Sequence, residues 1–88
     1  MEKLFYCVWH EPTNTFLTEY TDGEGNDYYR FVEFKDIALG GIYCDEIRAV
    51  DSLRFAKNNI YNKFVSLDSN QLSQCVVCPV NIHVYVQS

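Results

Sequence analysis

The most reactive side chains in this sequence belong to four cysteines and two histidines. Cys75 and Cys78 form a Cys-x-x-Cys pair, the spacing at which two thiolates on a tight turn bind zinc. A zinc site needs a second pair of ligands, and the candidate is Cys7 with His10. Residues three apart on an extended strand point to opposite faces, so these two side chains do not face one metal ion. We predict that the cysteines are small buried hydrophobic residues without a metal. A zinc-stabilised module through Cys75 and Cys78 is the alternative.

The same motif would need a helix directly after it for thioredoxin-type chemistry, because the helix dipole lowers the thiol pKa. The residues after Cys78 predict a strand instead. Neither His10 nor His83 has a Ser or Cys nucleophile at a motif spacing, and the sequence contains no Gly-x-Ser-x-Gly. Gly40-Gly41 is not followed by the Lys-Ser or Lys-Thr of a phosphate-binding loop. We predict a non-enzymatic protein that uses no cofactor.

Oxygen-bearing side chains recur between residues 22 and 33 at the spacing of a calcium-binding loop. The sixth position of such a loop is a glycine that makes a sharp turn, and here it is Asp27. The flanking residues predict strands, whereas a calcium loop of this type lies between two helices. An acidic hairpin tip explains this segment better than a calcium site.

The segment from Glu19 to Tyr29 places carboxylates and tyrosines on both sides of a predicted turn. Carboxylates on an exposed hairpin can imitate nucleic-acid phosphates or contact a basic patch on a protein, and tyrosines supply rigid contact area. A solvated loop that keeps the protein soluble would contain the same residue types. We predict a partner-binding site made of the following residues: Glu19, Tyr20, Asp22, Glu24, Asp27, Tyr28 and Tyr29.

The net charge of −5 is unevenly distributed. Residues 1–46 hold ten acidic and three basic side chains, a net charge of −7, whereas residues 47–88 carry a net charge of +2. This balance disfavours direct nucleic-acid binding, which needs a basic face to replace the counterions on phosphate. We predict one negative face and a protein partner with a basic surface.

Four segments have the pattern of β-strands. Residues 3–10 are apolar on both faces, which is typical of a central strand. Residues 15–20 follow at hairpin distance, and residues 28–34 follow a glycine-containing turn at 21–27, so we expect antiparallel pairing. Residues 75–86 alternate between apolar and polar side chains, and we place this half-buried strand beside the first.

One helix is predicted at residues 51–64, with Asp51 as its N-cap. An apolar stripe follows three- and four-residue spacing along it: Leu53, Ala56, Ile60 and Phe64. Residues 66–74 predict a loop or a short helical turn. Residues 35–46 give no clear element, although residues 42–44 suit a short strand.

These elements predict a single α+β domain over residues 1–88. We expect an antiparallel sheet of four to five strands with one main amphipathic helix packed on one face. Hydrophobic residues make up 48% of the chain, enough for one core. No signal peptide is visible and no apolar run approaches the roughly 20 residues that span a bilayer, so we expect a cytoplasmic protein without a membrane partner.

The layout resembles the small single-domain accessory proteins of tailed phages. Four features carry the resemblance: the aromatic opening strand from Lys3, the hairpin from Glu11 to Leu17, the amphipathic helix, and the closing strand from Pro79. That group includes inhibitors of host defence systems, anti-CRISPR proteins among them. The resemblance implies an inhibitor in the host cytoplasm that occupies a basic, nucleic-acid-binding site on a host protein. The alternative is a structural or self-assembling protein, a homodimer joined through an edge strand such as residues 80–86.

Overall fold

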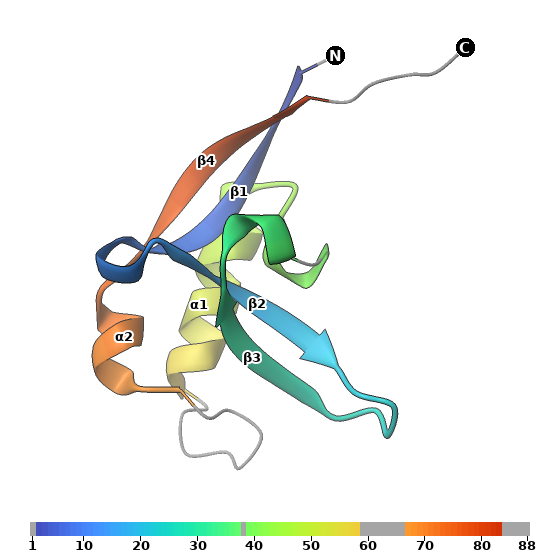
Figure 1. Cartoon of the computed structure of the whole chain (residues 1–88), viewed down its shortest axis with the longest axis vertical. Coiled ribbons are helices and arrows are strands. Elements are labelled where there is room, and N and C mark those ends of the chain that lie inside the picture. The colour runs from blue at the N-terminus through green and yellow to red at the C-terminus, as the bar shows by residue number, and fades with distance from the viewer. Residues whose placement is uncertain (1, 38, 59–66, 84–88) are drawn as a thin grey trace.

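The computed structural model describes residues 2–37, 39–58 and 67–83, and these contain a four-stranded antiparallel sheet with one main helix (Figure 1). The predicted α+β fold class is therefore confirmed. In chain order the elements are β1 (Glu2–His10), η1 (Glu11–Thr13), β2 (Thr15–Thr21), β3 (Asp27–Val32), η2 (Phe34–Asp36), η3 (Leu39–Gly41), α1 (Glu46–Asn58), α2 (Ser69–Ser73) and β4 (Cys75–His83). The predicted last strand is present over Cys75–His83, and residues 84–86 lie outside the described part.

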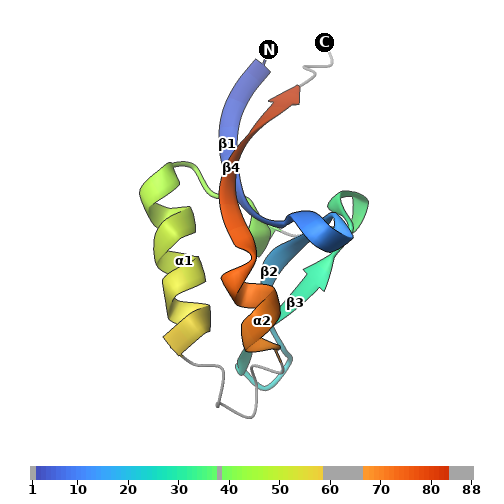
Figure 2. The same cartoon turned by 90° about the vertical axis from the view of Figure 1, so that its left-hand side faces the viewer.

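The strand order β3-β2-β1-β4 places β1 inside the sheet, as predicted from its two apolar faces. β1 pairs with β4 along its whole length, from Glu2 opposite His83 to His10 opposite Cys75. With β2 it pairs only at Trp9 and His10. The N-terminal half of β1 and the facing half of β4 therefore leave the body of the molecule as a two-stranded ribbon (Figure 1, Figure 2).

Tyr43 occupies part of the space beside β1 that β2 leaves open. Its backbone N–H donates to the carbonyl oxygen of Tyr6, and the N–H of Tyr6 donates to that of Tyr43, both at 2.9 Å. This isolated bridge is the extent of the short strand considered at residues 42–44. Because Tyr6 directs both backbone groups away from β4, its opposite residue Pro79 faces the open edge of the sheet. A missing N–H costs nothing there.

The main helix α1 (Glu46–Asn58) begins before Asp51, so the prediction that Asp51 is the N-cap is wrong. Asp45 caps the first turn instead, because its Oδ1 accepts a hydrogen bond from the N–H of Arg48 at 2.8 Å. Asp51 lies inside the helix, 3.9 Å from the guanidinium of Arg54. Both aspartates precede an arginine by three residues, so the local pattern does not distinguish the cap from the interior position.

Small side chains bring α1 close to the sheet. Ala49, Ser52 and Ala56 are its buried residues, and both alanines have no exposed surface. Leu53 packs against the core, so it and Ala56 behave as the apolar stripe predicts. The rest of the predicted stripe lies outside the described residues: Ile60 and Phe64.

The face of β2 opposite α1 is covered by η2 and η3, two short helices that the sequence patterns did not predict. Gly40 and Gly41 lie so close to β2 that a side chain on either would collide with it. A methyl group on Gly40 would meet the carbonyl oxygen of Glu19, and one on Gly41 would meet the hydroxyl of Thr18. Glycine is therefore required at both positions by close approach.

The core lies between the sheet and the two helices. The short helix α2 is one of the two predictions for residues 66–74, and it buries Leu72, which is 1% exposed. Asp68 caps this helix by accepting a hydrogen bond from the N–H of Asn70 at 2.8 Å. The buried cluster consists of Val8, Leu17, Tyr29, Ala49, Ala56, Leu72 and Cys75. Among the described residues, no helix is long and apolar enough to cross a membrane.

Candidate functional site

The hairpin between β2 and β3 ends in a tip that Asp22 holds in shape. Its Oδ1 accepts hydrogen bonds from the backbone N–H groups of Asn26 (2.9 Å) and Glu24 (2.8 Å). These bonds favour the ionised form and lower the pKa of the Asp22 carboxyl. Gly25 takes a φ of 83°, a conformation that side-chain-bearing residues rarely adopt. The Asp22 carboxylate is thus a structural part of the turn.

Two tyrosines stack beside this tip. Tyr20 and Tyr28 are register partners whose ring centroids lie 5.4 Å apart with planes at 19°. The guanidinium of Arg30 lies over the ring of Tyr20, 5.8 Å from its centroid. Both rings are half-buried and point away from α1, because the neighbouring Tyr29 points toward it. The stack gives the hairpin a rigid aromatic surface.

Glu19 and Tyr29 lie on the opposite face of the same hairpin. Tyr29 is 5% exposed and its ring centroid is 6.3 Å from that of Phe55 on α1. Tyr29 therefore belongs to the core and presents no side chain to a partner. The side chain of Asp27 lies outside the described part. Of the predicted site residues, the structure brings Tyr20, Tyr28 and the tip carboxylates together, and it separates Glu19 and Tyr29 from them.

The acidic residues of the first half are distributed over several elements, and the single negative face stays a prediction. Glu11, for example, lies in η1, at the end of β2 opposite the hairpin tip. Two carboxylates of this half are in exposed ion pairs, Glu33 with Lys35 at 3.3 Å and Asp45 with Arg48 at 3.5 Å. In the second half, Asp51 pairs with Arg54 at 3.9 Å. Within the described ranges neither Asp22 nor Glu24 is in an ion pair.

Glu19 lines a cleft of about 570 Å³ between the hairpin and α1, to which polar and aromatic side chains contribute, Arg48 and Asp51 among them. The Tyr43 hydroxyl in this cleft donates to the carbonyl oxygen of Gly40 at 2.9 Å, and it lies 2.6 Å from the hydroxyl oxygen of Ser52. Burial raises the pKa of Tyr43, so it stays a neutral phenol. The cleft offers hydrogen-bonding groups rather than an activated nucleophile.

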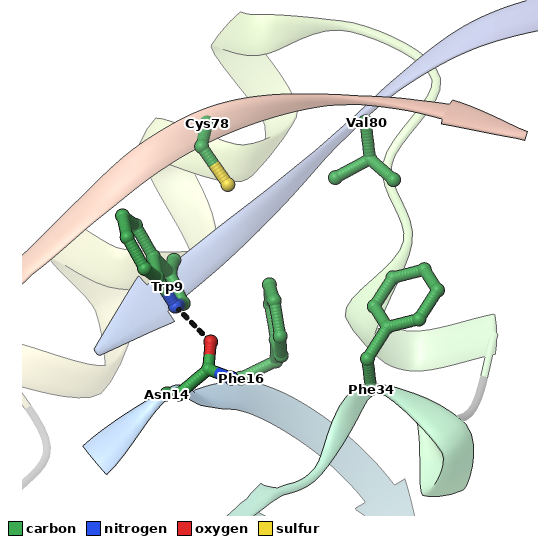
Figure 3. A pocket seen from close by; sticks show the side chains of 6 residues that line it. All are labelled: Trp9, Asn14, Phe16, Phe34, Cys78 and Val80. Carbon is green, nitrogen blue, oxygen red and sulfur yellow. Dashed lines mark hydrogen bonds between the residues drawn. The ribbon is translucent and has the colours of Figure 1, made fainter. Parts of the chain in front are cut away.

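An apolar hollow of about 370 Å³ lies on the open face of the sheet, away from α1 (Figure 3). Its lining consists of Trp9, Asn14, Phe16, Phe34, Cys78 and Val80. The indole N–H of Trp9 donates to Oδ1 of Asn14 at 3.0 Å, which pairs these two polar groups with each other. Phe16 and Phe34 meet edge to face with centroids 5.3 Å apart. This hollow was not predicted from the sequence, although the apolar outer face of residues 3–10 was a signal for it.

The cysteines of the Cys-x-x-Cys pair point to opposite faces of β4. Cys75 is buried in the core, where its Sγ donates to the carbonyl oxygen of Gln71 at 3.2 Å, and Cys78 lines the apolar hollow. In the described part of the chain, no three His, Cys, Asp or Glu side chains lie close enough to hold a metal ion. The acidic turn at residues 22–26 is flanked by strands, so it does not have the helices of the calcium loop considered above.

His10 is 2% exposed and both of its ring nitrogens have partners. Nδ1 lies 2.7 Å from the Thr13 hydroxyl oxygen, and Nε2 lies 3.0 Å from Oε1 of Gln74. Because an amide oxygen only accepts, Nε2 carries a proton and donates to it. The ring also packs at 5.5 Å against Phe31. His10 therefore joins the β1–β2 connection to the end of α2 as a structural residue.

No family model, curated protein or solved structure matches this chain. Its own geometry defines an α+β domain with three surface features: a hairpin with an acidic tip and stacked tyrosines, a cleft of mixed polarity between sheet and helix, and an apolar hollow on the open sheet face.

Proposed function

We propose that this protein is a small, non-enzymatic binding protein whose β2–β3 hairpin contacts a basic surface on a partner protein. The observation that carries the proposal is the contrast between Glu24 at the tip and carboxylates such as Asp45. Glu24 is exposed and has no ion-pair partner in the described ranges, whereas Asp45 is neutralised by Arg48. An unpaired exposed carboxylate is free to attract a basic side chain during encounter.

The hairpin that carries this carboxylate is held in a fixed conformation. Asp22 fixes the turn through its backbone hydrogen bonds, and the Tyr20–Tyr28 stack fixes the strands behind it. A site that is already ordered loses less conformational entropy on binding than a flexible loop does. Tyrosine is also enriched at interface centres, where it combines apolar area with a hydrogen-bonding tip.

The resemblance to phage accessory proteins narrows the proposed partner to a host protein that binds nucleic acid through a basic site. By occupying that site, the hairpin would act as an inhibitor, for example of a defence system such as CRISPR. This part of the proposal depends on the resemblance, whereas the contact through the hairpin depends on the geometry.

The test compares single charge reversals at two exposed positions. Glu24→Lys places the new charge at the tip, and Glu11→Lys makes the same change at the far end of β2. Asp22 is left intact because its carboxylate holds the turn. Tagged wild-type protein captures partners from host lysate, and mass spectrometry quantifies each captured protein against both variants.

We expect Glu24→Lys to reduce capture of the specific partner at least about tenfold, since like charges facing each other across an interface cost several kcal/mol. Glu11→Lys should leave capture nearly unchanged. Equal capture by wild type and Glu24→Lys would contradict the proposal. An equal loss in both variants would show that net charge matters and the hairpin does not.

Self-association through the open sheet face is the second candidate, and exposed apolar side chains favour it. Val76 is 48% exposed and Phe34 is 43% exposed, and both belong to the face that carries the hollow. Pairing through the β4 edge is less favourable, because Pro79 lacks the N–H that a neighbouring strand would need there. A molecular mass that rises with protein concentration, and returns to the monomer value in Val76→Lys, would support this candidate.

A further inference from the structure

Two cysteines face each other across the β1–β4 ribbon. Cys7 and Cys78 are direct register partners, so their side chains leave the sheet on the same face. The pair of His10 and Cys75, three positions along, points to the other face and into the interior. Cys7 has no exposed surface, whereas Cys78 is half-buried and its sulfur points into the apolar hollow (Figure 3).

The spacing of these two positions is compatible with a disulfide. Tyr6 and Pro79 form a pair without mutual backbone hydrogen bonds, so the next pair, Cys7 and Cys78, is of the hydrogen-bonded kind. Such pairs have Cα atoms about 5.5 Å apart, inside the range of about 4.4–6.8 Å that disulfides span. In hydrogen-bonded pairs the Cβ atoms lie toward the wide end of the range of about 4.5–5.5 Å, up to about 1 Å beyond the roughly 3.5–4.5 Å of a relaxed disulfide. The bond would therefore be strained, and strained disulfides are the easily reduced ones.

The electrostatics of the pair agree with this proximity. Burial, and to a lesser extent the neighbouring Cys78, raise the pKa of Cys7 to about 11. Burial also raises the pKa of Cys78. Few thiolates are present at neutral pH, so exchange is slow there and accelerates about tenfold per pH unit below the pKa.

We propose that Cys7 and Cys78 are a reversible redox pair that forms a cross-strand disulfide on reaction with a small-molecule disulfide, such as oxidised glutathione. Cys78 loses its proton and attacks one glutathione sulfur, which breaks the glutathione disulfide and releases one glutathione as a thiolate. Cys7 then loses its proton and attacks the Cys78 sulfur of the mixed disulfide, releasing the second glutathione. The two protein thiols lose two electrons and two protons, and one oxidised glutathione becomes two reduced molecules.

The surroundings determine the order of the two steps. Cys78 reacts first because the hollow, about 370 Å³ in volume, gives a small molecule access to its sulfur. Cys7 is reached only from its partner across the ladder, so it acts as the resolving thiol. Cys75, although close in sequence, is on the other face of β4 and does not compete.

The experiment treats the full-length reduced protein with oxidised glutathione near pH 9, where thiolates are more abundant. A Cys44→Ser background is used, because Cys44 is exposed and would react with glutathione independently. Free thiols are then alkylated, and intact mass and peptide mapping identify the products. Circular dichroism confirms that the protein stays folded during the reaction.

We expect a monomer that has lost two hydrogens and contains a Cys7–Cys78 peptide, and reduced glutathione should reverse the change. In Cys7→Ala the reaction should stop at one glutathione on Cys78. In Cys78→Ala, Cys7 should stay a free thiol without attached glutathione. A Cys75–Cys78 link, the absence of any link in folded protein, or direct glutathionylation of Cys7 in Cys78→Ala would each overturn the proposal.

Discussion

The buried hydroxyl of Thr18 allows a prediction whose sign is unusual for a core substitution. Thr18 has no exposed surface, and among the described residues its Oγ1 has no hydrogen-bond partner. A buried hydroxyl without a partner costs about 1–3 kcal/mol. Valine has the same shape, with a methyl group in place of the hydroxyl, and a similar preference for strands. We therefore expect Thr18→Val to stabilise the protein.

The magnitude is limited by the neighbouring backbone. Gly41 lies directly against the Thr18 hydroxyl, and a methyl group needs slightly more room than an oxygen does. This crowding offsets part of the gain, which leaves a net increase of about 1 kcal/mol in the free energy of unfolding. For a domain of this size the melting temperature should rise by about 4–8 °C.

Urea unfolding followed by the fluorescence of Trp9, the single tryptophan, measures this effect. Thr18→Ser is the matched control, because it keeps the hydroxyl and removes the buried methyl group. It should lower the free energy of unfolding by about 1 kcal/mol. If Thr18→Val is as destabilising as Thr18→Ser, the hydroxyl contributes a hydrogen bond and the reasoning is refuted.

Two further predictions concern close packing and alkaline stability. Gly40→Ala should lower the free energy of unfolding by about 2 kcal/mol or more, because the methyl group would collide with the carbonyl oxygen of Glu19. Gly23→Ala, which meets open space, should change it by less than about 0.5 kcal/mol in the same urea titration. Burial raises the pKa of Cys7 and Cys75 from 9.0 to about 11, so the native state keeps protons that the unfolded chain loses. Stability should therefore be fully present below pH 9.0 and should fall between pH 9.0 and 11 under reducing conditions. The fall should be shallower in Cys7→Ala, and an equally steep fall would contradict the assignment.

The strands could be predicted from the sequence because their patterns and turns are local. The start of α1 could not, since Asp45 and Asp51 have the same relation to a following arginine. The choice between the two caps depends on where the helix packs on the sheet. Ala49 is buried in that contact, so the helix begins before it and Asp45 is the cap. The segment that covers β2 also escaped prediction, because Gly40 and Gly41 are needed for close approach rather than for a turn.

The sequence predicted which segment forms the candidate site, but not which of its residues share one face of the sheet. The segment was placed correctly on a hairpin tip, but strand alternation already implies that Glu19 points away from Tyr20 and that Tyr29 points away from Tyr28. Strand alternation by itself therefore excludes Glu19 and Tyr29 from the face that carries Tyr20 and Tyr28. The apolar hollow is a different case, because it joins β1, β2, β4 and η2, and their adjacency arises only from the folded topology.

The long β1–β4 ribbon also determines how the molecule responds to mechanical force. Glu2 and His83 sit opposite each other at its free end, beyond the point where β1 has left β2. Tension applied at these two positions runs parallel to the interstrand hydrogen bonds, which lie perpendicular to the strands. The bonds would then break one after another, as in a zipper, rather than together in shear. The ribbon should peel open at low force while the part of the sheet that packs on α1 stays intact.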